Sequence, residues 1–111
     1  MPPMSSRLEE IQSIIAQLPD DPFPRYGLAL EYKNLGQLDE ARGAFAELQE
    51  RHPGYVPQYL MHGNLLVQLK DREAARGVYQ RGIAAAQAAR NQHALGELRQ
   101  ALDALDEPED D

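Results

Sequence analysis

Hydrophobic residues in this chain recur at alternating steps of three and four, which is the spacing of one face of an α-helix. The first stripe runs through Leu8, Ile11, Ile15 and Leu18, and Pro19 follows it. Five further stripes of the same kind cover the segments 22–35, 38–51, 56–69, 71–89 and 92–105. No segment alternates at every second residue as a half-buried strand does. The pattern therefore predicts an all-α protein of about six helices, the first of them over 5–18.

Residues that favour helix ends separate these stripes. Gly36 follows the second stripe and is expected to end that helix in the left-handed conformation. Asp71 and Asn91 precede the fifth and sixth stripes, where a side-chain oxygen can accept a hydrogen bond from the first turn. We expect both residues to be N-caps, and either Ser5 or Ser6 to cap the first helix.

The sequence also repeats itself at an offset of 34 residues. The residues that this offset brings together have the same identity or size: Ala41-Arg42-Gly43 with Ala75-Arg76-Gly77, Phe45 with Tyr79, Leu35 with Leu69, Ala29 with Gly63, and Pro19 with Pro53. The offset also aligns Ile11 with Phe45, so the first helix is the second half of an incomplete copy. Ala29 and Gly63 are expected to let paired helices approach closely. Gly43 and Gly77 recur at the same period and are expected to mark close packing as well.

These positions resemble the tetratricopeptide repeat, a 34-residue helix–turn–helix unit. In the first copy, Leu28, Ala29 and Tyr32 match the family's leucine, small residue and tyrosine. The remaining matches are Tyr59 and Gly63 in the fourth helix, Ala41 and Phe45 in the third, Pro53 after it, and Ala75 and Tyr79 in the fifth. The departures from the family pattern are Arg25 for an aromatic, His62 for leucine, Leu66 for tyrosine, and Gln87 for the late proline. Without that proline, the fifth helix is expected to run long.

The resemblance implies a short right-handed α-solenoid of antiparallel helix pairs. Its repeats would occupy 22–55 and 56–89, flanked by helices at 5–18 and 92–105, in a single domain over 1–105. That arrangement is typical of a small bacterial-type member with about two full repeats. Residues 106–111 are expected to form an acidic, disordered tail.

Members of this family bind peptides or proteins along a concave face made by the first helix of each repeat. The positions that the resemblance assigns to this face are Phe23, Tyr26, Leu30, Lys33, Leu60, Met61, Asn64 and Gln68. Asn64 matches an asparagine that holds a ligand's backbone by two hydrogen bonds, although a solvated or internally bonded amide is an alternative. Family members that clamp a chaperone's C-terminal carboxylate need lysine and asparagine where this chain has Tyr26, Leu30 and Met61. An apolar or mixed groove for a hydrophobic helix or strand is therefore favoured.

The expected function is that of an adaptor that binds a protein or peptide partner on this face. Two alternatives remain open at the level of sequence. The sixth helix could fold back and fill the groove, or the exposed end helices could stack into a homodimer in a structural module without a separate ligand.

The distribution of charge argues against nucleic acid and membrane surfaces as partners. The formal net charge is −7, but six of the 18 acidic residues lie between Asp103 and Asp111. The other 102 residues carry 12 acidic residues against all 11 basic ones and show no basic run. The first residues lack the uninterrupted apolar run of a secretory signal, which leads us to expect a cytoplasmic protein.

The side chains available for catalysis or cofactor binding are few. There is no cysteine, and the three histidines are scattered along the chain. His93 and Glu97 are four residues apart, as expected of a surface ion pair, and His62 lies on a packing face. Adjacent carboxylates such as Asp20 and Asp21 point in different directions on a helix. We therefore expect no enzyme, no metal site and no cofactor.

Overall fold

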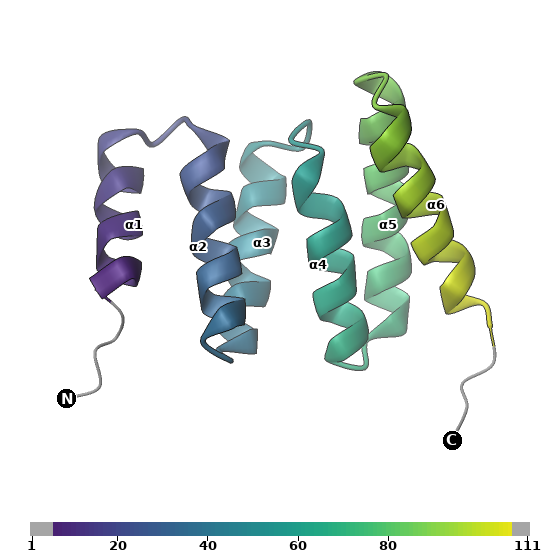
Figure 1. Cartoon of the computed structure of the whole chain (residues 1–111), viewed down its shortest axis with the longest axis horizontal. Helices are drawn as coiled ribbons and strands as arrows, with labels where there is room; N and C mark the ends of the chain where they lie inside the picture. Colours follow the sequence, from purple (N-terminus) through teal and green to yellow (C-terminus); the bar gives the residue numbers. More distant parts are fainter. Residues whose placement is uncertain (1–5, 108–111) are drawn as a thin grey trace. The chain divides into compact units, whose positions relative to one another are not determined.

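The computed structural model of the protein describes residues 6–107 and contains six α-helices in that range. They are α1 (Ser6–Gln17), α2 (Pro22–Asn34), α3 (Leu38–Arg51), α4 (Pro57–Gln68), α5 (Arg72–Ala88) and α6 (Gln92–Leu105) (Figure 1). The predicted all-α class is confirmed. Helices α1 to α3 and helices α4 to α6 form two compact parts that divide between His52 and Pro53.

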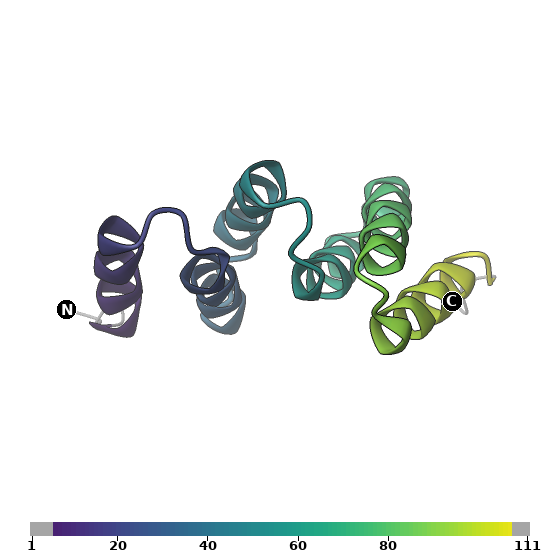
Figure 2. The ribbon, with the colours of Figure 1, turned by 90° about the horizontal axis from the view of Figure 1, so that it is seen from above.

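The first part is built around α2, which packs on both α1 and α3 (Figures 1 and 2). Its buried apolar side chains are Leu8 of α1, Ala29 of α2, and Ala41, Phe45 and Leu48 of α3. The last three recur at steps of four and three along α3, as the periodicity predicts. The small Ala29 has no exposed surface, in keeping with the close approach expected for this position.

The second part is a bundle of three helices in which α5 packs on both α4 and α6, and α4 also touches α6 (Figure 2). One cluster of buried residues forms its core: Val56, Tyr59, Leu66, Ala75, Val78, Tyr79, Ala86, Leu95, Leu98 and Leu105. Helix α5 has 17 residues against 14 in α3, which confirms that it runs long.

The glycines that allow close packing differ in part from those that the repeat suggests. A Cβ atom on Gly63 would overlap the ring of Tyr79, and one on Gly82 would lie 2.5 Å from the Cβ of Tyr59. The prediction for Gly63 is therefore confirmed. The prediction for Gly43 and Gly77 is wrong, because a Cβ on Gly43 would meet nothing within 4 Å and one on Gly77 would meet only the end of the Arg81 side chain, at 3.4 Å.

The N-terminal ends of three helices carry side-chain caps. Asp71 accepts a hydrogen bond from the Ala74 amide at 3.1 Å, and Asn91 accepts one from the Ala94 amide at 3.0 Å, so both predicted N-caps are confirmed. Asp21 caps α2 in the same way through the amide of Phe23. For α1, Ser6 lies inside the helix, and Ser5 lies outside the described residues.

The C-terminal ends of α2, α4 and α5 share one turn with a residue in the left-handed region. Gly36 has φ 76°, as expected, while the equivalent positions are Lys70 with φ 67° and Arg90 with φ 56°. In each case, the next amide bonds back to a carbonyl in the last turn, for example Asp71 N to Leu66 O at 2.9 Å. The repeat thus keeps the backbone of this turn but not the glycine.

The acidic C-terminal segment begins with an ordered contact. Asp106 forms an ion pair with Arg76 of α5 at 2.7 Å, and the disordered tail expected over 106–111 stays a prediction. Residues 108–111 of that predicted tail lie outside the described residues. None of the helices described is long and apolar enough to span a membrane.

Candidate partner-binding site

A groove in the second part runs between α4 and α6, with α5 as its floor. It has a volume of about 320 Å³ and is lined by Asn64, Val67, Arg72, Tyr79, Ala101, Ala104 and Leu105. Small side chains of α6 form one wall, and Asn64 and Val67 of α4 form the other. Helix α6 therefore bounds this groove and does not fill it.

Asn64 is held in this groove by a buried tyrosine. The Tyr79 hydroxyl donates a hydrogen bond of 2.6 Å to Asn64 Oδ1. Burial raises the pKa of Tyr79 above its ordinary value, which keeps the hydroxyl protonated as a donor. The bond uses one lone pair of the oxygen of the exposed Asn64 carboxamide and orients the group, so that its amide nitrogen can donate to a ligand. The sequence left an internally bonded amide as an alternative for Asn64. The structure shows such a bond at the oxygen of the carboxamide.

Two arginines of α5 fasten the end of α6 beside the groove. The Arg72 guanidinium donates to the backbone carbonyl of Leu105, which is one of the unpaired carbonyls in the last turn of α6. Arg76 pairs with Asp106 immediately after it. A cation at a helix C-terminus also meets the negative end of the helix dipole favourably. These contacts fix the wall of the groove that contains Ala101 and Ala104.

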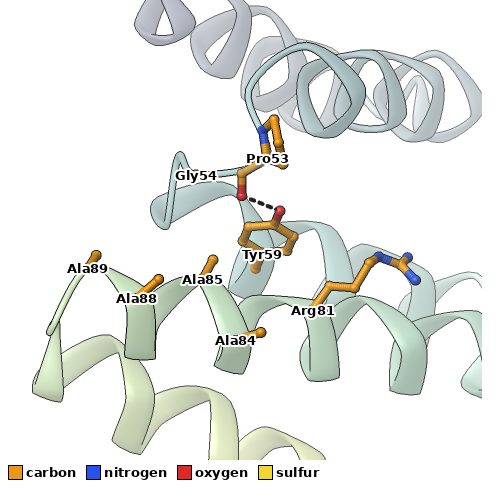
Figure 3. A pocket seen from close by; sticks show the side chains of 8 residues that line it. All are labelled: Pro53, Gly54, Tyr59, Arg81, Ala84, Ala85, Ala88 and Ala89. Atoms are coloured by element: carbon orange, nitrogen blue, oxygen red, sulfur yellow. Dashed lines mark hydrogen bonds between the residues drawn. The ribbon is translucent and has the colours of Figure 1, made fainter.

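A second cleft in this part has an alanine-rich floor (Figure 3). It has a volume of about 620 Å³ and is lined by Pro53, Gly54, Tyr59, Arg81, Ala84, Ala85, Ala88 and Ala89. The Tyr59 hydroxyl donates to the Pro53 carbonyl at 2.5 Å. Burial raises the pKa of Tyr59, and the positive charge of Arg81 partly offsets that rise. The cleft is therefore largely apolar, with one exposed guanidinium on its rim.

The predicted site residues of the first part lie along α2 at steps of three and four. Phe23 is in the first turn and 67% exposed, while Tyr26, Leu30 and Lys33 are half-buried. Their spacing places them on one side of the helix. An exposed phenylalanine at the start of this stripe is the strongest apolar contact point that the described residues of α2 offer.

The predicted site residues of the second part lie on α4. Asn64 and Gln68 are exposed, and Leu60 and Met61 are half-buried. Only Asn64 lines the groove between α4 and α6. Sequence reasoning missed Val67, Arg72, Tyr79, Ala101 and Ala104, because it assigned α6 to a cap and Tyr79 to packing. The pair Ala101 and Ala104 is the signal that could have found the α6 wall, since small residues three apart leave space on one helical face.

The histidines have the structural surroundings expected of them. His62 is buried, with 6% of its surface exposed. His93 and Glu97 form an exposed pair at 3.5 Å on α6. Among the described residues, no three metal-ligating side chains come together.

Among the comparisons with known proteins, the one with solved structures finds similar chains. A scan of protein-family models gives no match, and neither does a search of the curated proteins. A solution structure of a tetratricopeptide repeat domain protein from Salinibacter ruber is 34% identical, with a TM-score of 0.78 over 84% of this chain and 94% of that chain. A crystal structure of a tetratricopeptide repeat domain protein from the same organism is 35% identical, with a TM-score of 0.73 over 77% and 96%. A solution structure of a protein from Bordetella parapertussis is 28% identical, with a TM-score of 0.75 over 92% and 89%.

Antiparallel helix pairs that recur every 34 residues, with a small residue where the paired helices meet, define a helical-repeat module. The likeness to the Salinibacter ruber domains identifies which one, and the chain belongs to the tetratricopeptide repeat family.

Proposed function

We propose that this protein is a non-catalytic adaptor for a protein partner, with one contact surface on α4 and a separate one on α2. The observation that carries the proposal is the groove beside Asn64. It combines apolar side chains with a few polar ones, among them Asn64, which is oriented by its bond to Tyr79, and this is the composition of a peptide-binding groove.

The groove indicates what kind of segment it accepts. Val67, Ala101 and Ala104 favour an apolar side chain of modest size. Beside them, the amide hydrogens of Asn64 can donate to a backbone carbonyl of the ligand, since the bond from Tyr79 involves the oxygen and not the amide nitrogen. A ligand that presents an apolar side chain next to an unpaired carbonyl fits both features. An extended strand meets this condition better than the interior of a helix, whose carbonyls are already bonded.

The first part would contribute an apolar contact of its own through the α2 stripe that begins at Phe23. Its exposed ring offers a large contact area at low entropic cost, which is typical of anchor residues at interfaces. We place the adaptor in the cytoplasm, because a cysteine-free chain is compatible with that compartment.

Asn64→Asp provides a sharp test of the groove. The aspartate keeps an oxygen acceptor for the Tyr79 hydroxyl, so the internal hydrogen bond and the fold are preserved, but it removes both amide donors. Partners would be captured from a lysate of the native source, identified by mass spectrometry, and their binding segments measured as synthetic peptides by calorimetry. We expect Asn64→Asp to weaken binding at least about tenfold, through the lost hydrogen bond and the repulsion between the new carboxylate and the ligand carbonyl.

Gln80→Glu is the matched control, because it makes the same change of charge on an exposed residue of α5. It should bind like the unaltered protein. Phe23→Ala tests the α2 stripe separately from the groove. A captured partner whose affinity is unchanged by both Asn64→Asp and Phe23→Ala would contradict the proposal.

A further inference from the structure

Helix α1 has an apolar side that nothing in the described part of the chain covers. Ile14 is 43% exposed and Leu18 50% exposed, while Leu8 is buried on the side that packs against α2. Together with Arg7 and the half-buried Ile11, these residues give the spacing 7, 11, 14, 18. Steps of four, three and four form the seam of a two-helix coiled coil.

The repeat shows that this side of the helix normally receives another helix. The offset of 34 residues that aligns Ile11 with Phe45 also aligns Ile14 with Leu48, and both Phe45 and Leu48 have no exposed surface. In the next copy, the same two positions are Tyr79 and Gly82, which lie against Gly63 and Tyr59 of the preceding helix α4. Among the described residues, α1 has no preceding helix.

The uncovered side also contains a recess of a recognisable form. A depression of about 520 Å³ on α1 is lined by Arg7, Glu10, Ile11, Ser13 and Ile14. Four of these, at positions 7, 10, 11 and 14, are related as i, i+3, i+4 and i+7. That set forms the hole into which a side chain of a facing helix inserts.

We propose that a second copy of this chain covers α1, through an antiparallel pairing of the two α1 helices about a two-fold axis. In this register, Ile14 of each copy enters the hole of the other. Ile11 and Ile14 therefore meet in two equivalent layers, with Arg7 opposite Leu18 at both ends. The pairing does not use the α2 and α4 residues of the proposed adaptor site.

Charge complementarity supports a second copy in this orientation. Arg7 lies in the first turn of α1, where a cation is unfavourable, and the last turn of α1 contains no basic residue. Its Nε donates to Glu31 at 3.1 Å, yet 74% of the side chain stays exposed. An antiparallel partner places this guanidinium beside the last carbonyls of the opposite α1, where a cation is favourable.

The other end of the chain does not offer a matching surface. Glu97, Arg99, Gln100 and Asp103 are all exposed along α6 and would meet the isoleucines of α1 with polar groups. Head-to-tail stacking of copies through α6 is thus disfavoured, and pairing of α1 with itself closes the assembly as a dimer. Because a pair of short helices buries less area than a standard interface, we expect a dissociation constant on the order of 10 µM.

Analytical ultracentrifugation of the full chain between roughly 1 and 300 µM tests the dimer. We expect a reversible monomer–dimer equilibrium that Ile14→Glu weakens at least about tenfold, because a carboxylate would enter the hole. Gln100→Glu adds the same charge to the exposed side of α6 and should leave the equilibrium unchanged. A monomer throughout this range would overturn the proposal, and a helix of another protein would then be the remaining candidate to cover α1. A dimer whose dissociation constant is unaffected by Ile14→Glu would equally overturn it.

Cysteine cross-linking tests the orientation, since the native chain contains no cysteine. In the antiparallel register Ile11 of one copy faces Ile14 of the other, so a mixture of Ile11→Cys and Ile14→Cys chains should form a disulfide-linked dimer on mild oxidation. In the antiparallel register, the two Ser6 positions are separated by about 20 Å along the axis, so Ser6→Cys should not. If each seam variant formed a disulfide with itself more readily than the mixture did, the helices would be parallel and the proposed register would be overturned. Circular dichroism would show that each variant remains helical.

Discussion

At the scale of single residues, the repeat period identifies positions but not their surroundings. Gly43 and Gly77 recur in register, yet a side chain at Gly43 would meet nothing and one at Gly77 only a flexible arginine. Gly63, which aligns with Ala29, is the glycine that its neighbour Tyr79 requires. Recurrence alone cannot separate these cases, because helices are paired by side chains that lie on another segment.

This contrast predicts opposite effects for two similar substitutions. Gly63→Ala would force the buried Tyr79 ring to move and should reduce the free energy of unfolding by about 1–3 kcal/mol. Gly43→Ala should instead increase it by about 0.5–1 kcal/mol, since alanine is the better helix former and no atom stands in its way. Urea denaturation of the two variants beside the parent chain measures both. Destabilisation by Gly43→Ala would mean that α3 packs more closely at this residue than described.

The candidate site shows the same limit. The family resemblance pointed to Asn64, and the structure places it in a groove. The resemblance did not indicate that the oxygen of Asn64 accepts a hydrogen bond from Tyr79, which lies 15 residues further along the chain. A residue's hydrogen-bonding partner depends on tertiary packing, so it could not be derived from the spacing on α4.

At the scale of helices, sequence predicted nearly everything, because the signals that start and end a helix are local. All six helices begin and end within about two residues of the segments predicted from the apolar stripes, and Asp71 and Asn91 cap the helices that they precede. The unexpected result is that Lys70 takes the left-handed conformation that Gly36 takes one repeat earlier. A lysine gives no signal of that backbone.

Left-handed geometry costs a lysine more than a glycine, which leads to a prediction about the end of α4. Lys70→Gly should raise the free energy of unfolding by roughly 1 kcal/mol, because it removes the clash of Cβ with the backbone. Gly36→Ala should lower it by a similar amount at the equivalent turn of α2. Thermal and urea unfolding would compare the pair. If Lys70→Gly were destabilising instead, a contact of the lysine side chain would outweigh the backbone cost.

At the scale of the whole molecule, the 34-residue period identified the architecture and therefore the family. It did not predict that the chain divides into two compact parts that bury different numbers of large side chains. The main buried cluster lies entirely between Val56 and Leu105, whereas the first part buries fewer large side chains. A period describes how equivalent positions recur, but the quantity of core in each part depends on which residues occupy them.

The unequal cores predict unequal behaviour of the separated parts. A fragment of residues 53–111 should fold alone, because it retains the whole buried cluster and the arginine contacts to the end of α6. A fragment of residues 1–52 should be largely unfolded, since domains this small are marginal and it buries only about half as many apolar side chains as the longer fragment does. Circular dichroism and urea denaturation of each fragment would establish this. A cooperative transition in the shorter fragment, or none in the longer, would contradict it.

The exposed side of α1 is apolar and that of α6 is polar, and this difference determines where the repeat array can be extended by protein engineering. A new helix could be fused upstream, where Ile11 and Ile14 offer an apolar packing surface. A downstream helix would instead face the exposed polar side chains of α6. An upstream helix with the apolar pattern of α2 would turn the incomplete first unit into a full repeat and occupy the surface that we assign to a second copy. Lengthening the array at that end should therefore yield a larger protein that stays monomeric.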